Sequence, residues 1–155
     1  MNEQEQPRPA QTGAEPDPYQ GYNFRVEIHG LTEGAFTECS GMGVTVHALR
    51  YAEGRSPVVR RIPGQLEYAD VTLRYGLTNS RDLWLWMKKT LDGNIERKNV
   101  SIMLLARDGH TEVLRWNLIN AWISQWRGAP LDAMAQEIAI ESITLVYETL
   151  NDDKT

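Results

Sequence analysis

The sequence has little of what metal, redox or disulfide chemistry requires. Cys39 is the only cysteine, so the chain cannot form an internal disulfide, and a secreted fold held together by disulfides is excluded. We expect Cys39 to be a buried structural thiol, because no basic cluster lies beside it. The three histidines are far apart in the sequence and lack the short spacing of a zinc or iron site. They are interpreted as surface or loop residues.

Long apolar runs are missing as well. Residues 1–13, MNEQEQPRPAQTG, contain no apolar stretch of the kind that a signal peptide needs. No later stretch approaches the roughly 20 apolar residues of a membrane span. We therefore expect a soluble protein that is initially cytoplasmic and has no stable membrane insertion.

Positive charge is not in excess. The chain has 155 residues, of which 24% are charged, and a formal net charge of -5. Phosphate binding usually needs a clustered basic surface, so we expect no nucleic-acid specificity.

Catalytic motifs are also absent. Ser40, in CSGMG, lacks the glycine two residues earlier that a nucleophile elbow has. The GMG piece lacks the Lys-Ser/Thr pair of a phosphate-binding loop, and no motif places a pair of carboxylates. The sequence therefore predicts a protein that is not an enzyme, with no catalytic, metal or cofactor-binding residues and no cofactor.

The composition divides the chain into three parts. Residues 1–18 are rich in Pro, Gln and Glu and almost free of apolar side chains, so they predict a flexible N-terminal arm. Residues 19–150 form one domain, and residues 151–155 form a short charged tail.

Alternating apolar residues predict about seven strands. These are residues 22–28, 35–40, 44–51, 66–75, 97–106, 112–123 and 135–148. The 97–106 strand is expected to be paired on both sides, and Asp108-Gly109 to close a hairpin after it. The fold class is mainly β, most naturally a β-barrel or sandwich with one external helix.

The helix is predicted over residues 80–91. Ser80 is its expected N-cap, and Gly93 its stop. The expected buried stripe consists of Leu83, Trp86, Met87 and Leu91.

Three tryptophans lie in one segment, RWNLINAWISQWRGAP, which otherwise reads as a strand. Trp116, Leu118, Trp122 and Trp126 share one parity, which predicts a single packing face. The tryptophans are interpreted as core and interface anchors, in preference to a sugar-binding platform.

Residues 52–64, AEGRSPVVRRIPG, lack the apolar periodicity of a core element and are predicted to project as a long loop. Arg55, Arg60 and Arg61 make this loop basic within an acidic chain. We expect them to contact the acidic face of a neighbouring copy, or to bind an anion.

The last predicted strand alternates through Ile138 and Ile140 and then changes phase, which predicts a bulge near Ser142. If these isoleucines fill the core, Glu137 and Glu141 point away from it. They are candidates for the lining of a channel, or for pairing with arginines across a subunit joint.

Taken in order, six segments resemble the tail tube proteins of contractile phages, closest to the inner tube proteins of extracellular contractile injection systems. They are DPYQGYNFRVEIHGL, GAFTECSGMG, YAEG followed by RRIPGQLEYADVTLRYGLT, LWLWMKKTLDGNIERKNVSIML, RWNLINAWISQWRGAPLDA and EIAIESITLVYE. The resemblance runs from Asp17 to about Leu150. Two features depart from the family: AWISQW has no proline after AW, and the arm is longer than the family needs.

The resemblance implies a β-barrel-like subunit that forms hexameric rings by extending sheets between neighbours. The rings stack into a hollow tube inside a contractile sheath, which drives the tube through a target envelope. The implied partners are the sheath protein, the baseplate or tube-initiating protein, the terminator protein and a protein cargo in the lumen. The particle would be assembled in the cytoplasm and then released or kept in the cell.

Two other readings remain open. The tube-initiating subunit at the baseplate shares the same pattern as the main tube subunit. A monomeric barrel that binds a small ligand or carbohydrate would shield its aromatic side chains in a pocket.

Overall fold

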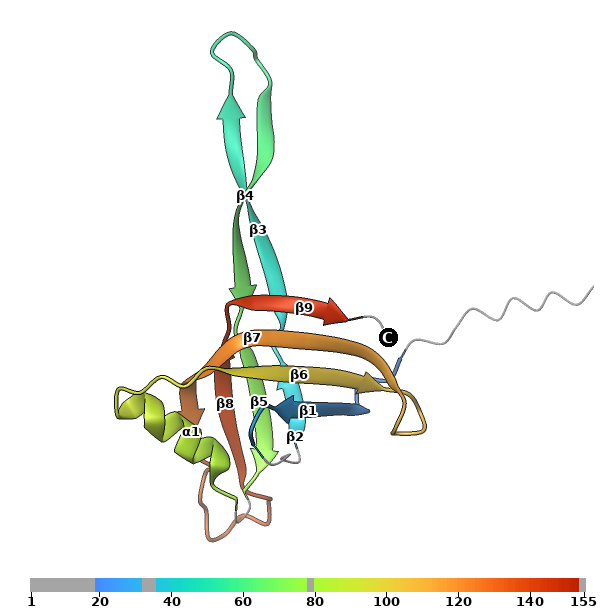
Figure 1. Ribbon diagram of the computed structural model, residues 1–155, viewed down its shortest axis with the longest axis vertical. Helices are drawn as coiled ribbons and strands as arrows, with labels where there is room; N and C mark the ends of the chain where they lie inside the picture. Colours follow the sequence, from blue (N-terminus) through green and yellow to red (C-terminus); the bar gives the residue numbers. More distant parts are fainter. Residues whose placement is uncertain (1–18, 32–35, 78–79, 154–155) are drawn as a thin grey trace, which may run out of the picture.

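The computed structural model describes residues 19–31, 36–77 and 80–153 (Figure 1). The predicted arm, residues 1–18, lies outside the described residues. The fold class, mainly β with a single helix in the described part, is confirmed. In chain order the elements are β1 (Phe24–Ile28), β2 (Phe36–Ser40), β3 (Gly43–Ala52), β4 (Val59–Ala69), β5 (Val71–Gly76), α1 (Asp82–Leu91), β6 (Lys98–Leu105), β7 (Glu112–Arg127), β8 (Ile140–Val146) and β9 (Thr149–Asp153).

Seven of the strands form one antiparallel sheet in the order β1-β6-β7-β8-β5-β2, with β9 added to β7. β6 is paired on both sides, as predicted. β1 and β2 end the sheet without pairing to each other, so the described strands form an open, folded sheet rather than a closed barrel. β3 and β4 form a separate two-stranded hairpin that projects from this body (Figure 1).

The sheet folds because β7 belongs to two portions of it. The first portion contains β1, β6, β9 and the start of β7, while the second contains β2, β5, β8 and the end of β7. Figure 1 shows the strands of the two portions crossing at a steep angle. Two sheet portions that cross in this way enclose one core between them.

The corner of β7 lies at Asn120, which has a positive φ of 54°. Asparagine tolerates this conformation better than most residues. The side chain of Asn120 donates to Glu148 Oε2 at 2.9 Å, and its backbone N–H donates to Asn99 Oδ1 at 3.1 Å. The corner is thus held by contacts to chain segments on either side of it.

The corner changes which side chains of β7 are buried. Leu118 is fully buried before it, but Ala121 and Ile123 are the fully buried residues after it. A second register shift, between Ile123 and Gln125, precedes the half-buried Trp126. The predicted single packing face of one parity is therefore wrong, because each shift by one residue exchanges the two faces of a strand.

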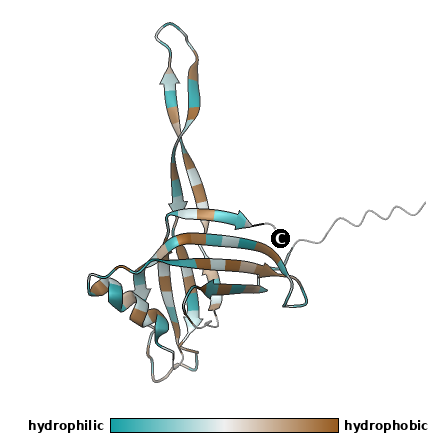
Figure 2. Cartoon of the chain, viewed as in Figure 1, coloured by the Kyte–Doolittle hydropathy of each residue, from teal (hydrophilic) through white to brown (hydrophobic). Residues whose placement is uncertain are grey.

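The core combines side chains from both portions with one tryptophan of the helix. Its members are Val26, Ile28, Val71, Leu73, Trp86, Val100, Ile102, Leu118, Ala121, Ile123, Ile143, Leu145 and Tyr147. In Figure 2, apolar positions alternate with polar ones along the strands that supply them. This alternation is typical of a sheet that buries one face and exposes the other.

The helix α1 packs against β7 through its tryptophans. Trp86 is 2% exposed, and its Nε1 donates to the backbone oxygen of Glu96 at 2.7 Å. The ring of Trp84 lies 4.8 Å from that of Trp126, measured between centroids. Trp84, Trp86 and Trp126 therefore act as packing residues.

Two details of the predicted helix are wrong. Arg81, rather than Ser80, occupies the N-cap position, and its side chain makes no capping hydrogen bond. Leu91 is 62% exposed instead of buried, because it is the last helical residue, where the helix leaves the sheet. Gly93 follows with a φ of 87°, as a helix stop requires.

The final segment also differs from the prediction. β8 begins only at Ile140, and Ile138 lies before it with 79% of its surface exposed. The pairing of β8 with β5 continues without a shift, so the predicted bulge near Ser142 is absent. The change of apolar phase instead marks the end of a loop, residues 128–139. β9 brings residues 151–153 of the expected tail into the sheet.

The predicted hairpin between β6 and β7 is confirmed. Asp108 accepts hydrogen bonds from the backbone N–H groups of His110 and Thr111, both at 2.8 Å, and Gly109 adopts a φ of 74°. Together with the Thr111 hydroxyl, these donors lower the pKa of Asp108 to about 2. The turn therefore keeps its carboxylate charged well below neutral pH.

Two isoleucines of the final segment, Ile143 and Ile138, give a matched test of the core. Ile143 is fully buried, so Ile143→Ala should lower the free energy of unfolding by about 2–5 kcal/mol. Ile138→Ala removes the same atoms from an exposed site and should change it by no more than about 0.5 kcal/mol. Urea denaturation of both variants measures the difference. Equal losses would contradict the described position of β8.

Candidate assembly surfaces

The hairpin of β3 and β4 contains the predicted basic segment, residues 52–64. This segment projects as expected, but it is not a long loop, because residues 59–64 belong to β4. The predicted strand over residues 66–75 is likewise divided, since β4 ends at Ala69 and β5 begins at Val71. At its base, the hairpin is fixed to the core by Tyr147, whose hydroxyl donates to the backbone oxygen of Ala69 at 2.7 Å.

The hairpin carries an exposed apolar pair on each of its two faces. Val46 pairs with Leu66 and Leu49 pairs with Ile62, and directly opposed residues lie on the same face of a ribbon. These four side chains are 41–53% exposed. A two-stranded ribbon of this kind is marginally stable alone, and its exposed apolar side chains favour an interaction with a partner.

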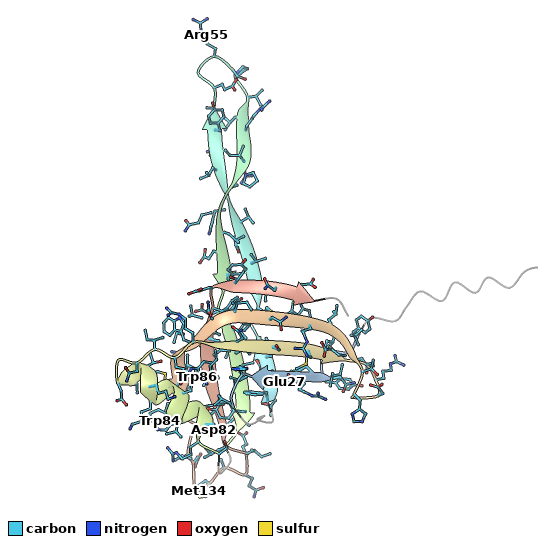
Figure 3. The ribbon with its side chains drawn as sticks, in the orientation of Figure 1. Glu27, Arg55, Asp82, Trp84, Trp86 and Met134 are labelled. Atoms are coloured by element: carbon cyan, nitrogen blue, oxygen red, sulfur yellow. The ribbon has the colours of Figure 1, made fainter. Side chains whose placement is uncertain are left out.

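The hairpin is also basic. Arg50 and Arg61 are directly opposed across the two strands, where like charges are unfavourable. Arg55 lies at the tip, far from the body (Figure 3). Across residues 19–31, 36–77 and 80–153, none of Arg50, Arg55, Arg60 and Arg61 has an ion pair. The hairpin therefore presents uncompensated positive charge.

The faces of the apolar pairs in the hairpin could not be predicted from the sequence. Two residues of β4, Gly64 and Gln65, lie opposite one residue of β3, His47, so the register shift places an extra residue in β4. This residue exchanges the faces of β4 while β3 keeps its alternation. The pair of Leu49 and Ile62 therefore lies on the face opposite the pair of Val46 and Leu66.

Glu137 and Glu141 do not share a strand face, contrary to the basis of the lumen prediction. Glu137 is exposed in the loop before β8, whereas Glu141 is half-buried in β8 and accepts a hydrogen bond from the Tyr75 hydroxyl at 2.9 Å. Burial and this hydrogen bond raise the pKa of Tyr75, which stays protonated. A role for either glutamate in lining a channel stays a prediction.

The three histidines lie on separate parts of the structure. His47 is on the hairpin, with its Nε2 2.6 Å from Glu67 Oε2, while His29 and His110 are in exposed turns elsewhere. In the described part of the chain, no three His, Cys, Asp or Glu residues are grouped closely enough to hold a metal ion. No helix of that part is long and apolar enough to cross a membrane.

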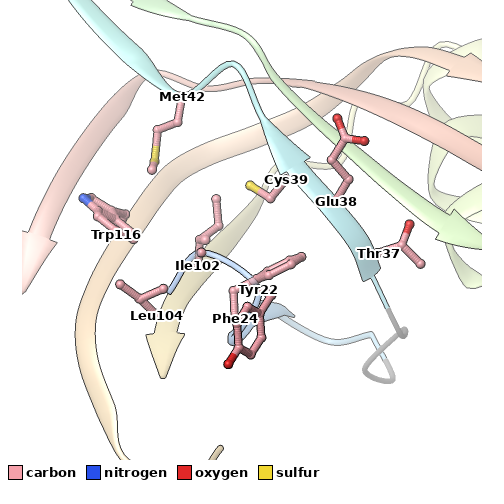
Figure 4. Close-up of a pocket in the computed structure, with 10 residues that line it drawn as sticks. Tyr22, Phe24, Thr37, Glu38, Cys39, Met42, Ile102, Leu104 and Trp116 are labelled. Carbon is pink, nitrogen blue, oxygen red and sulfur yellow. The ribbon is translucent and has the colours of Figure 1, made fainter. Parts of the chain in front are cut away.

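Cys39 lines an open pocket of about 300 Å³ between β2 and the first sheet portion, with both apolar and polar residues around it (Figure 4). Burial, with a smaller contribution from Glu38, raises the pKa of the thiol to about 11, so it is protonated at neutral pH. The neighbouring walls include Phe24, Ile102 and Trp116. Glu38 is the one charged residue that lines the pocket, and its Oε2 lies 3.8 Å from Arg74 Nη1. The pocket lacks the converging polar groups of a ligand site.

The fold and the exposed apolar and basic side chains of its hairpin indicate a structural subunit that assembles through such surfaces. A family model confirms this class and gives the family: the T4-like virus tail tube protein gp19 model matches residues 20–151. The chain belongs to this tail tube protein family. A search of curated protein sequences finds no match.

Solved structures support the same assignment. The chain is 25% identical to a protein in the structure of the anti-feeding prophage cap, with a TM-score of 0.82 over 92% of this chain and 95% of that one. It is 26% identical to a protein in the PVC sheath/tube terminator structure, with a TM-score of 0.82 over 90% of this chain and 99% of that one. The PVC sheath-tube complex contains a chain of the same fold, with 24% identity, a TM-score of 0.81 and coverage of 97% and 100%.

A substitution at Gly64 tests the close approach of β3 and β4 in the hairpin. A Cβ at this position would lie 2.6 Å from Leu49 Cγ and 2.7 Å from the backbone oxygen of His47. Gly64→Ala should therefore separate β3 from β4 and cost about 1–3 kcal/mol. Hydrogen exchange at the β3 and β4 amides should become at least about fivefold faster. Gly54→Ala, where no atom lies within 4 Å, is the matched control. Unchanged exchange in both variants would contradict the register.

Proposed function

We propose that the chain is the main subunit of the inner tube of a contractile particle related to extracellular contractile injection systems. In this proposal, six copies form a ring, and the rings stack into a hollow tube that a sheath surrounds. The observation that carries it is the match to the tail tube family over residues 20–151. The structures of the PVC sheath-tube complex and tube terminator support a sheath and a terminator as partners.

The distribution of apolar side chains supports a role in assembly. Val46, Leu49, Ile62 and Leu66 lie exposed on the hairpin, while the second sheet portion ends in the edge strand β2. Exposed edges and apolar ribbons are unfavourable in a monomer and become joints in a ring. A structural role of this kind needs no catalytic residue.

The purified chain should form rings or tubes. Negative-stain electron microscopy and sedimentation velocity measure this directly, first with the chain alone and then with the chain co-produced with the baseplate proteins of its particle. Co-production matters because tube growth can depend on an initiating ring. A chain that stays monomeric at every concentration and salt, with and without these partners, would contradict the proposal.

Arg55, Arg60 and Arg61 should contribute to joints between copies. Replacing all three by Ser removes positive charge from an exposed surface, so each change should alter fold stability by no more than about 0.5 kcal/mol. Tube length should nevertheless fall, because charge complementarity across the joint is lost.

The triple variant is compared with the wild-type chain by electron microscopy of tubes and by thermal melting of the unassembled subunit. Tubes of normal length and salt resistance would show that the arginines take no part in a joint. A large drop in melting temperature would show instead that they support the fold.

A further inference from the structure

The open pocket beside Cys39 lies at the seam where the sheet does not close. β1 and β2 are the two ends of the sheet path and do not pair with each other. Phe24 of β1 and Cys39 of β2 both line the pocket (Figure 4). The pocket therefore adjoins two strand edges that have no partner strand among the described residues, and such edges are usually covered in a stable protein.

Three aromatic side chains and a methionine line this pocket. They are Tyr22, Phe24, Trp116 and Met42, and Tyr22 is 72% exposed. The other three are only partly buried against the core. Proline-rich segments bind aromatic-lined surfaces in the polyproline II conformation, which is largely ordered before binding. The wall of the pocket therefore fits a short proline-rich peptide better than a small ligand, which needs converging polar groups.

The chain itself contains a proline-rich segment. Pro7, Pro9, Pro16 and Pro18, four of the seven prolines of the chain, all lie in the arm. This composition is typical of peptides that adopt polyproline II. The family model matches residues 20–151, so the arm is additional to the tail tube domain.

The charges of the arm and the pocket are complementary. Arg8 lies between Pro7 and Pro9 and is the only basic residue of the arm. Glu38 is the only charged residue that lines the pocket. Its ion pair with Arg74 spans 3.8 Å between exposed side chains, and a pair of this kind contributes little. The Glu38 carboxylate can therefore accept a second cation.

The arm is long enough to reach the pocket of its own chain. Gly21 and Tyr22 line the pocket, so the described chain begins beside it. Residues 10–18 separate Pro9 from Tyr19, and a segment of this length spans at most about 32 Å. A tethered segment is present at an effective concentration in roughly the millimolar range. This tethering favours the arm of the same chain over that of a second copy.

We propose that residues 7–9 dock in this pocket of their own chain and cover the seam between β1 and β2 while the subunit is unassembled. Pro7 and Pro9 contact the aromatic wall, and Arg8 pairs with Glu38. The covering role rests on the proposed function, in which edge strands become joints of a ring. A neighbouring copy then displaces the arm from the seam.

A cysteine introduced into the arm tests the docking, because Cys39 lines the pocket and is the only native cysteine. Ala10→Cys, next to Pro9, is oxidised in the unassembled 155-residue chain, and mass spectrometry follows the disulfide within one chain. Gln4→Cys and Ala14→Cys place the thiol elsewhere in the same arm. The raised pKa of Cys39 slows all three reactions alike, so their relative rates report proximity. Ala10→Cys should react at least about tenfold faster than the other two.

The prolines provide the matched control. Pro7→Ala with Pro9→Ala, added to Ala10→Cys, should remove this advantage, whereas Pro16→Ala with Pro18→Ala should leave it unchanged. Equal rates at the three cysteine positions would overturn the docking, because a freely moving arm gives no preference for one of them. Disulfides that join two chains instead of closing within one would also overturn it.

The same reaction in assembled tubes tests the covering role. The preference for Ala10→Cys should disappear there, because a neighbouring copy occupies the seam. Without the cysteine, Pro7→Ala with Pro9→Ala should lower the protein concentration at which rings form by at least about threefold, measured by sedimentation velocity. Pro16→Ala with Pro18→Ala should leave this concentration unchanged.

A preference that persists in tubes, or a concentration for ring formation that the loss of Pro7 and Pro9 leaves unchanged, would overturn the covering role. A wild-type chain that forms neither rings nor tubes would refute the proposed function and the covering role together. The disulfide rates in the unassembled chain would still decide whether the arm docks, so the two failures are distinguishable.

Discussion

The fold depends on one bent strand. β7 is shared by both portions of the sheet, so the corner at Asn120 decides whether the two portions can face each other. A straight β7 would extend the sheet as one layer and leave the apolar face of β6 without a cover. With the corner in place, Leu118 and Ile123 lie in the same core although they have opposite parity. The helix then needs to cover only one remaining side, which Trp86 does.

The strands of the body and those of the hairpin differ in burial. The body strands bury aliphatic side chains such as Leu73, Ile123 and Leu145, whereas the hairpin leaves Val46, Leu49, Ile62 and Leu66 exposed. The backbone hydrogen bonds between β3 and β4 and the anchor from Tyr147 to Ala69 keep the ribbon in position without a core of its own. A rigid extension of this kind loses little conformational entropy when it binds, which favours its use as a joint.

Much of this fold follows from the sequence, because alternation indicates which residues face the core. Val26 and Ile28, or Val100 and Ile102, are buried as their spacing predicts. The failures occur where alternation is interrupted. Ile138 continues the pattern of Ile140 into a loop, and no local feature distinguishes the two. The corner at Asn120 exchanges the two faces of β7, and the extra residue opposite His47 exchanges those of β4. Neither change follows from the local alternation of apolar residues.

The same limit applies to the assembly surfaces. Arg55, Arg60 and Arg61 were recognisable from sequence because three arginines lie within seven residues of an acidic chain. Val46 and Leu66 were not, because an apolar residue in a single sequence is expected in a core until its exposure is known.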